Sequence, residues 1–229
     1  IPSVIILSCF FISLWGASMR FNTPMLFATA FLPMFGIGGL TGLPLGLNIS
    51  DIPLHDTYYV IGHFHYVVAP GTLLALFAGV YYWYPKITGR KMSERLGKLH
   101  FWPTLIFMNG IFFPMLLQGL AGVSRRMYDG GMTYAHGQHV HYLNHIESTC
   151  AWGLALAQIP FLINVVRSLR SGEKASQNPW EATTLEGEAP TPPPHGNFAT
   201  APVVYRGPYE YSVPGQSRDF LPQNQPARS

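Results

Sequence analysis

The sequence predicts an all-α membrane protein, a polytopic bundle of five transmembrane helices followed by an extended, proline-rich C-terminal tail. Only 11% of the 229 residues are charged, which is less than half the share in an ordinary soluble chain. Before Lys86 the only charged residues are Arg20, Asp51 and Asp56. Because a soluble domain needs a charged surface to stay dispersed, a purely soluble protein is excluded.

Five uncharged runs are each long enough for a membrane helix, which needs about 17 to 25 mostly apolar residues. The predicted spans are residues 1–19, 21–50, 57–84, 99–124 and 148–166. The second run is long enough for a helix and a glycine-rich exit, and small residues there favour close helix packing. Residues 1–171 therefore form the predicted membrane region and residues 172–229 the tail.

Basic residues in the short loops predict the orientation. The loop between the third and fourth runs carries one acid against five basic residues, Lys86, Arg90, Lys91, Arg95 and Lys98. Such loops face the cytoplasm or its equivalent, so we expect this loop and the tail on the cytoplasmic or matrix side. Residues 47–56 and 124–147 then lie outside, where Arg125 and Arg126 break the rule.

The tail differs in composition from the membrane region, because residues 172–229 hold ten of the twenty prolines. Its aromatic residues are numerous for a freely mobile linker, and they are Tyr205, Tyr209, Tyr211 and Phe220. We expect the tail to lie along a partner or the inner surface of a complex. A net charge of +3 without a dense basic run gives no reason to expect nucleic acid.

Two histidines in the third span are the most informative residues. The segment 55–66 reads HDTYYVIGHFHY, and ionisable groups at membrane depth indicate function. At about 100° per residue, His63 and His65 point to opposite faces of a helix, so they cannot share one metal ion. This spacing favours two separate groups that each bind one imidazole, and haem iron is a natural candidate. The alternative is two core histidines that bind neighbouring helices.

Three motifs together closely resemble the catalytic subunit I of the haem-copper respiratory oxidases, above all the cytochrome c oxidases. They are residues 55–66, the string GGLTG at 38–42 and the pair Arg125 and Arg126. The resemblance runs from residue 1 to about 185 and covers the last five of that family's twelve spans. It implies an enzyme of a bacterial inner or mitochondrial inner membrane. Electrons would pass from cytochrome c or a quinol through a low-spin haem to a high-spin haem and copper, which reduce oxygen to water with proton pumping.

The resemblance also implies roles for the histidines. His63 would be the catalytic-centre ligand of the high-spin haem, and His65 an axial ligand of the low-spin haem, both haems being a-type. Phe64, between them, would lie close to both groups. A single helix would then set the spacing of the two irons, a positioning role that is typical of proteins that bind such cofactors.

At the outer side the resemblance implies a second set of residues. His55 and Asp56 would bind magnesium or manganese, which suits a hard cation that retains several waters. Arg125 and Arg126 would bind the haem propionates, for which guanidinium groups are well shaped, and Asp51 would lie near the high-spin propionates. The alternatives are that Asp56 caps the third helix, that Asp51 is an exposed loop acid, and that the arginines are solvated.

Some features depart from the family or go beyond it. Ile6 stands where the family usually has the lysine of a proton-conducting helix, so that route is not predicted here. The outer loop holds four further histidines, which we interpret as a polar surface rather than an extra metal site: His136, His139, His141 and His145.

The second low-spin haem ligand and the copper-binding histidines have no match in the chain. We therefore expect the N-terminal half of subunit I to lie either in another chain or in a part of the protein outside this sequence, and subunits II and III to be further partners. Three other functions remain open. They are a nitric oxide reductase on the same scaffold, which the pair His55 and Asp56 disfavours, a non-catalytic haem-binding half-subunit, and a transporter that uses the histidines as a proton relay.

Overall fold

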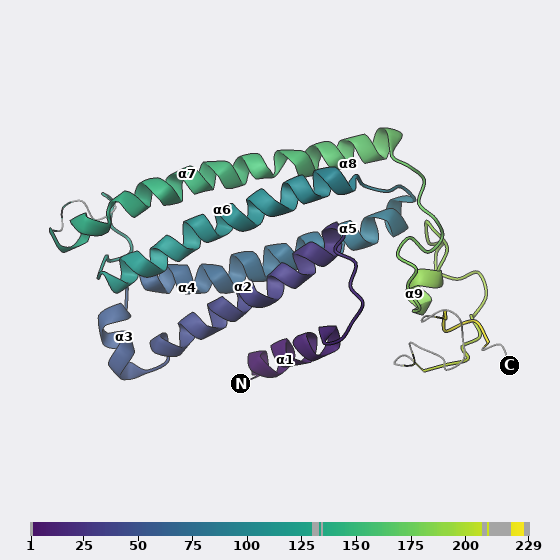
Figure 1. The fold of residues 1–229 in the computed structure, drawn as a ribbon, viewed down its shortest axis with the longest axis horizontal. Coiled ribbons are helices and arrows are strands. Elements are labelled where there is room, and N and C mark those ends of the chain that lie inside the picture. The colour runs from purple at the N-terminus through teal and green to yellow at the C-terminus, as the bar shows by residue number, and fades with distance from the viewer. Residues whose placement is uncertain (1, 130–132, 134, 208–209, 211–220, 227–229) are drawn as a thin grey trace. The chain divides into compact units, whose positions relative to one another are not determined.

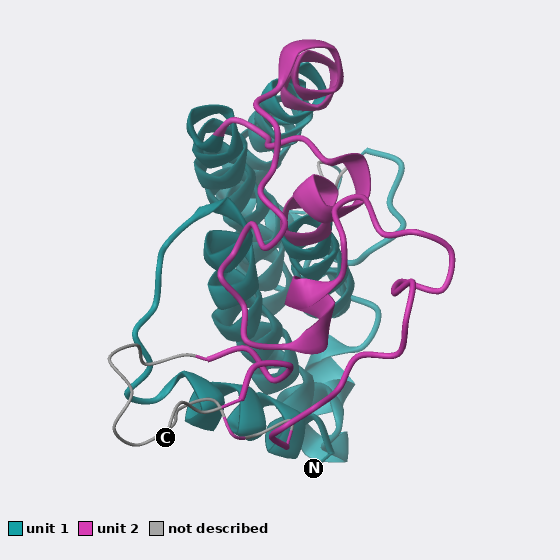
Figure 2. Cartoon of the chain, turned by 90° about the vertical axis from the view of Figure 1, so that its right-hand side faces the viewer, with its two compact units in different colours: residues 1–80, 94–163 teal, residues 81–93, 164–229 magenta. Residues whose placement is uncertain are grey.

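The structure is a computed structural model that describes residues 2–129, 133, 135–207, 210 and 221–226. Helices account for nearly all regular structure in these residues (Figure 1). The chain divides into two compact units (Figure 2). Unit 1 comprises residues 1–80 and 94–163, and unit 2 comprises residues 81–93 and 164–229.

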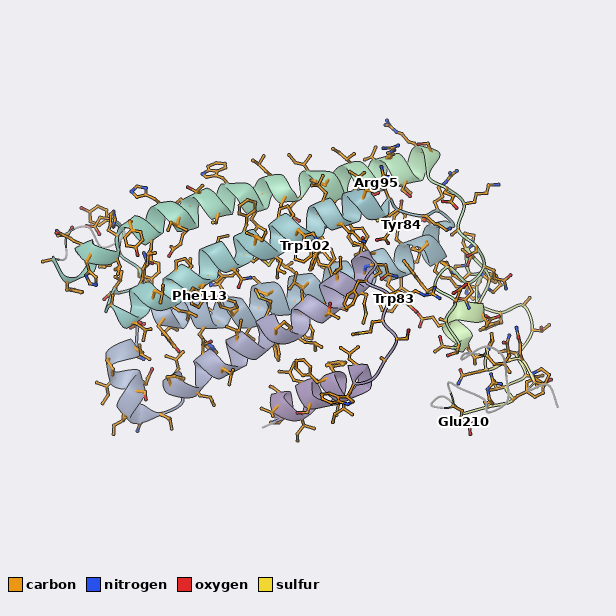
Figure 3. All side chains as sticks on the ribbon, in the orientation of Figure 1. Trp83, Tyr84, Arg95, Trp102, Phe113 and Glu210 are labelled. Atoms are coloured by element: carbon orange, nitrogen blue, oxygen red, sulfur yellow. The ribbon has the colours of Figure 1, made fainter. Side chains whose placement is uncertain are left out.

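Four helical stretches of the described chain are long and apolar enough to cross a membrane: Thr23–Leu45, Tyr58–Thr88, Glu94–Leu120 and Tyr142–Ser171. They match the second to fifth predicted spans, which confirms an all-α, multi-pass membrane fold. The first predicted span forms a shorter helix, α1 (Pro2–Leu14). Large apolar side chains remain exposed on the bundle, as expected in lipid. Trp102 and Phe113 on α6 (Glu94–Leu120) are each 51% exposed (Figure 3).

Helix α2 (Thr23–Leu45) begins where the sequence provides a cap. The Asn22 side chain accepts a hydrogen bond from the Met25 amide at 3.2 Å, which satisfies one of the donors left open at a helix start. Further along, α2 crosses the helix that carries the histidines. A Cβ atom on Gly38 would lie 2.9 Å from the backbone nitrogen of Val67, so a glycine is required for this close approach.

The sequence predicts the third span as one run, residues 57–84, but the structure divides it into several helical segments. A short helix α3 (Asn48–Leu54) precedes α4 (Tyr58–Val68), which continues through the π-helical turn η1 (Ala69–Leu74) into α5 (Ala75–Thr88). Pro70 within η1 lacks the amide hydrogen that an α-helix needs at that position. Prolines and π-turns are the usual causes of such a local change in a long helix.

Helix α6 (Glu94–Leu120) lies between α4 and α7 (Tyr142–Ala157) in unit 1 (Figure 1). The Glu94 carboxylate accepts hydrogen bonds from the amide and the hydroxyl of Thr23, at 2.9 and 2.8 Å. This contact joins the starts of α2 and α6. Near the other end of α6, a side chain on Gly119 would overlap the backbone of Tyr59, so α4 and α6 touch closely there.

The last span consists of α7 and α8 (Ile159–Ser171) with a turn at Gln158. Pro160 at the start of α8 cannot donate a backbone hydrogen bond, which explains the break. The residue at this turn contacts the core: Gln158 Oε1 lies 3.0 Å from Nε2 of His100, a fully buried histidine. The His100 ring lies among three aromatic rings, those of Phe27, Phe77 and Phe161.

Within unit 2, the first part of the predicted tail is hydrogen-bonded to the end of α5. The Lys86 ammonium donates to three backbone carbonyls, at 2.7 Å to Gln177, 2.7 Å to Gly187 and 2.5 Å to Ala189. The last two flank the end of the short helix α9 (Leu185–Glu188). The Trp180 ring stacks on Tyr82 with centroids 5.7 Å apart.

Of the tail aromatics named above, Tyr205 is 54% exposed. Tyr209, Tyr211 and Phe220 lie outside the described residues.

Candidate functional site

His63 is held from the neighbouring helix. Its Nδ1 atom lies 2.8 Å from the carbonyl oxygen of Gly38 and 3.2 Å from the hydroxyl of Thr41, both on α2. Because a carbonyl oxygen can only accept, Nδ1 carries the hydrogen and Nε2 presents a lone pair. Histidines that bind metals usually have this arrangement, in which a backbone carbonyl fixes the tautomer and the orientation of the ring.

Gly42 provides the space for the His63 ring. A Cβ atom on Gly42 would lie 2.6 Å from Cε1 and 3.2 Å from Nε2 of His63. No side chain larger than hydrogen fits there unless the ring moves. The string GGLTG therefore contributes three features to the His63 site: the carbonyl of Gly38, the hydroxyl of Thr41 and the space that the missing side chain of Gly42 leaves for the ring.

His65 is held by its own helix and by α6. Its Nδ1 lies 2.9 Å from the Ile61 carbonyl oxygen, one turn earlier on α4. Its ring stacks on Phe112 of α6, with centroids 5.0 Å apart and planes at 20°. This Nδ1 must also carry a hydrogen, so Nε2 again presents a lone pair. The two imidazoles contact different helices, His63 touching α2 and His65 touching α6.

Phe64 lies between the two histidines in the sequence and is 43% exposed. Its ring centroid lies 4.1 Å from that of His65, while both histidines are half-buried. Helix α4 thus combines an exposed aromatic ring with two oriented imidazoles that lie on different faces. A flat, apolar ligand with a central metal fits such a surface, because it needs one imidazole nitrogen and apolar contacts around it.

A second group of polar residues lies between α3 and α4. His55 Nδ1 is 3.4 Å from Asp51 Oδ2, and His55 Nε2 is 3.8 Å from Asp56 Oδ2. The His55 side chain is 68% exposed. Within the described residues no three His, Cys, Asp or Glu side chains form a group that could hold a metal ion. A cation bound here would therefore need further ligands from water or from another chain.

Asp56 is bound to Arg125 in the loop that follows α6. Arg125 Nε donates to Asp56 Oδ1 at 2.7 Å, Arg125 Nη2 forms an ion pair with the same oxygen, and the Arg125 amide donates to the Asp56 carbonyl at 2.9 Å. The hydrogen bond from the Arg125 guanidinium lowers the pKa of the Asp56 carboxyl below its usual value. The exposed carboxylate is therefore charged throughout the physiological pH range.

The alternative role of Asp56 as a helix cap is wrong. Thr57 is the cap of α4, since its hydroxyl accepts from the Tyr59 amide at 3.2 Å. Asp56 instead has a left-handed backbone, with φ at 57°, a conformation that aspartate tolerates better than most residues. This turn directs its carboxylate toward Arg125 rather than toward the helix start.

The remaining predicted residues are Arg126, the outer-loop histidines and Ile6. Arg126 is exposed and has φ at 67°. In the outer loop, His136 Nε2 lies 3.2 Å from the Gly122 carbonyl oxygen, and the rings of His141 and His145 are 6.0 Å apart. Ile6 on α1 is 54% exposed.

Sequence reasoning assigned no role to three of the residues that fix the histidines, Thr41, Gly42 and Phe112. A glycine and threonine string on a neighbouring apolar run was the available signal for the first two. Phe112 gave no signal, because a phenylalanine on an apolar run looks the same whether it stacks on an imidazole or on a leucine.

Together, the fold and the site define a multi-pass helical membrane protein that presents two oriented imidazoles from one helix. Residues 1–153 match the family model described as cytochrome c and quinol oxidase polypeptide I, and the chain belongs to this family. The alternative cytochrome c oxidase subunit 1 of Bradyrhizobium diazoefficiens is 45% identical over 228 residues, which are 99% of this chain and 39% of that relative.

Other relatives give the same result. Cytochrome c oxidase subunit 1 of Synechocystis is 46% identical over 209 residues, 90% of this chain and 36% of that relative. The chain thus spans well under half the length of these relatives. A chain of a heme-copper terminal oxidase dimer solved by cryo-EM is similar in fold, with a TM-score of 0.58 and 22% identity over 67% of this chain and 28% of that chain.

Proposed function

We propose that this chain is the haem-holding part of the catalytic subunit I of a terminal respiratory oxidase. The complete enzyme would pass electrons from cytochrome c through a low-spin haem to a high-spin haem and copper centre, reduce oxygen to water and pump protons. The names of the relatives, cytochrome c oxidase subunit 1, support this donor and this reaction. The observation that carries the proposal is the pair of imidazoles on α4, each with Nδ1 bound to a carbonyl and Nε2 presented as a ligand.

In this proposal His63 holds the high-spin haem and His65 the low-spin haem, both a-type. The haems supply electron transfer and oxygen binding, and the chain orients them. Gly38 and Gly42 set the direction of the His63 ring, while the hydrogen bond to Ile61 sets that of His65. Because both side chains leave one helix, α4 fixes the spacing of the two groups, and Phe64 occupies the position between them.

The polar end of α4 would bind the charged edges of the haems. Arg125 and Arg126 offer guanidinium groups that pair well with carboxylates. Asp51, which contacts His55, would lie near the high-spin propionates. Arg125 is oriented by Asp56, so its guanidinium is held in one direction. Asp56 here acts as a positioning residue for Arg125.

His55 and Asp56 would also bind a magnesium or manganese ion. Their facing atoms, His55 Nε2 and Asp56 Oδ2, are 3.8 Å apart, a separation at which one cation can contact both. Arg125 binds the other carboxylate oxygen, Oδ1. Asp56→Asn should weaken Mn²⁺ binding by at least about tenfold, the least that loss of even an indirect partner costs a metal site. Electron paramagnetic resonance of Mn²⁺ in the complex measures this, with His139→Ala as control. Equal affinity in Asp56→Asn and wild type would exclude the site.

The rest of the centre would come from other chains or segments. The copper ligands and the second low-spin haem ligand would belong to the N-terminal half of subunit I, and subunits II and III would complete the complex. The bacterial inner or the mitochondrial inner membrane is the expected location. The basic loop around Lys86 and Lys91 supports an orientation with the tail on the cytoplasmic or matrix side.

The test is the reduced-minus-oxidised absorption spectrum of the purified complex that contains this chain, recorded with and without carbon monoxide. Two haem populations, of which one binds carbon monoxide, are expected. A complex that contains no haem would overturn the proposal, and two populations that both bind carbon monoxide would overturn the assignment of a low-spin haem.

A further inference from the structure

A buried carboxyl group lies in the bundle away from the histidines. Glu147 on α7 is 8% exposed, and Gln118 on the facing helix α6 is 1% exposed. Glu and Gln are seldom buried to this degree unless they have hydrogen-bond partners. One oxygen of each, Glu147 Oε1 and Gln118 Oε1, has no hydrogen-bond partner among the described residues.

Both of these atoms are acceptors, so the site has an excess of acceptors over donors. The Gln118 amide nitrogen is already used, because it donates to Asn144 Oδ1 at 2.6 Å. Asn144 lies one turn before Glu147 on α7, and its own amide nitrogen lies 3.1 Å from His141 Nδ1. These contacts fix the amide orientations: the Gln118 nitrogen points to Asn144 and the Asn144 nitrogen to His141. The Gln118 oxygen is therefore the end of this series that lacks a donor.

Within the described part of the chain, Glu147 forms no ion pair with a cationic side chain. Residues 101–120 of α6 contain no titratable side chain. From α4, Tyr58 interacts electrostatically with Glu147, and a phenol cannot neutralise a carboxylate. On the α7 side His141 contacts Asn144, and His145 is exposed. Arg125 is bound to Asp56. An ionised carboxylate buried without a cation is far more costly than the neutral acid.

We propose that Glu147, Gln118 and Asn144 form a proton-binding site between α6 and α7, in which the Glu147 carboxyl holds a proton taken from the solvent. The bound proton supplies the missing donor. The carboxylic acid then donates toward Gln118 Oε1, directly or through one buried water. The hydrogen bonds continue in one direction from Glu147 through Gln118 and Asn144 to His141, which is half-buried near the outer loop.

Infrared spectroscopy of the complete complex at neutral pH tests the proposal, because it detects the carbonyl stretch of a protonated carboxyl without reference to the haems. A band of this type that shifts in heavy water is expected in the wild type. It should be lost in Glu147→Gln and kept in Glu173→Gln, which replaces an exposed glutamate. No difference between Glu147→Gln and wild type in this region would overturn the proposal.

A second variant serves if Glu147→Gln fails to assemble. Gln118→Met keeps the volume and removes the acceptor, so the Glu147 band should move to the higher frequency of a less strongly hydrogen-bonded acid. A band at an unchanged frequency would show that Glu147 is not the protonated group beside Gln118. Because neither result depends on the haem spectrum, failure here is distinct from failure of the proposed oxidase function.

Discussion

The Nδ1 atom of His63 on α4 lies 2.8 Å from the carbonyl oxygen of Gly38 on α2. The ring of this histidine is therefore oriented by a helix other than its own, and its position depends on how closely α2 and α4 approach. Glycines make this approach possible, at Gly38 against Val67 and at Gly42 against the His63 ring itself.

Gly42→Ala should displace the His63 ring, since the new Cβ atom would lie 2.6 Å from Cε1. The amount of haem that binds carbon monoxide should fall about tenfold or more, as is typical when the partner that orients a metal ligand is disturbed. The low-spin haem band should remain. Gly39→Ala is the matched control, because its new methyl group would have no atom within 4 Å. Equal spectra for the two variants would contradict the role of Gly42.

The Asp56 and Arg125 pair should be insensitive to pH near neutrality. The pKa of Asp56 is lowered from a usual value of 3.8, so the pair stabilises the loop above that value and the effect is lost only as the pH falls through the lower, folded pKa. Arg125→Gln should therefore speed hydrogen exchange at residues 121–126 equally at mildly acidic and mildly alkaline pH. An effect that disappears at mildly acidic pH would show that Asp56 is already protonated there.

His100→Ala should destabilise unit 1 by about 3 kcal/mol, within the range for truncating a large core side chain. The variant leaves a space among Phe27, Phe77 and Phe161 and removes the hydrogen-bond partner of Gln158 Oε1. The unfolding midpoint in detergent measures the loss. His139→Ala, at an exposed position, should change the free energy of unfolding by less than about 0.5 kcal/mol. Similar midpoints for both variants would refute the structural role of His100.

Lys86→Met should release residues 177–189 from the end of α5, because the ammonium is the donor to three carbonyls in that segment. Limited proteolysis of the complex is expected to cut within these residues faster in the variant than in the wild type. Lys91→Met removes only an ion pair with Glu173 at the surface and should leave the rate unchanged. If Lys86→Met is cut no faster, the segment is held mainly by other contacts, such as Trp180 on Tyr82.

The sequence predicted the membrane helices well, because a long uncharged, apolar run indicates that a helix lies in lipid rather than in water. Uncharged runs of sufficient length located the four long helical stretches, and the two-residue spacing of His63 and His65 already implied different directions. Two of the family motifs lie on segments that the structure brings into contact, residues 38–42 of α2 and His63 of α4.

Other features depend on tertiary contacts that composition does not contain. The π-turn at Pro70 changes the direction of side chains along α5 without changing the hydropathy of the run. Asp56 was assigned as a possible cap, yet a left-handed backbone turns it toward Arg125, 69 residues away in the chain. The burial of Glu147 could not be predicted, because a glutamate near a helix start is normally solvated. It is buried because α6 packs against α7.

Two single substitutions on α4 test most directly whether one helix holds two separate haems. In the assembled complex, His63→Ala should abolish the carbon monoxide-reactive haem signal while the low-spin band is retained, and His65→Ala should remove chiefly the low-spin band. Reduced-minus-oxidised spectra with and without carbon monoxide measure both in complexes of equal subunit content. The opposite pattern, or an unchanged spectrum in both variants, would contradict the assignment.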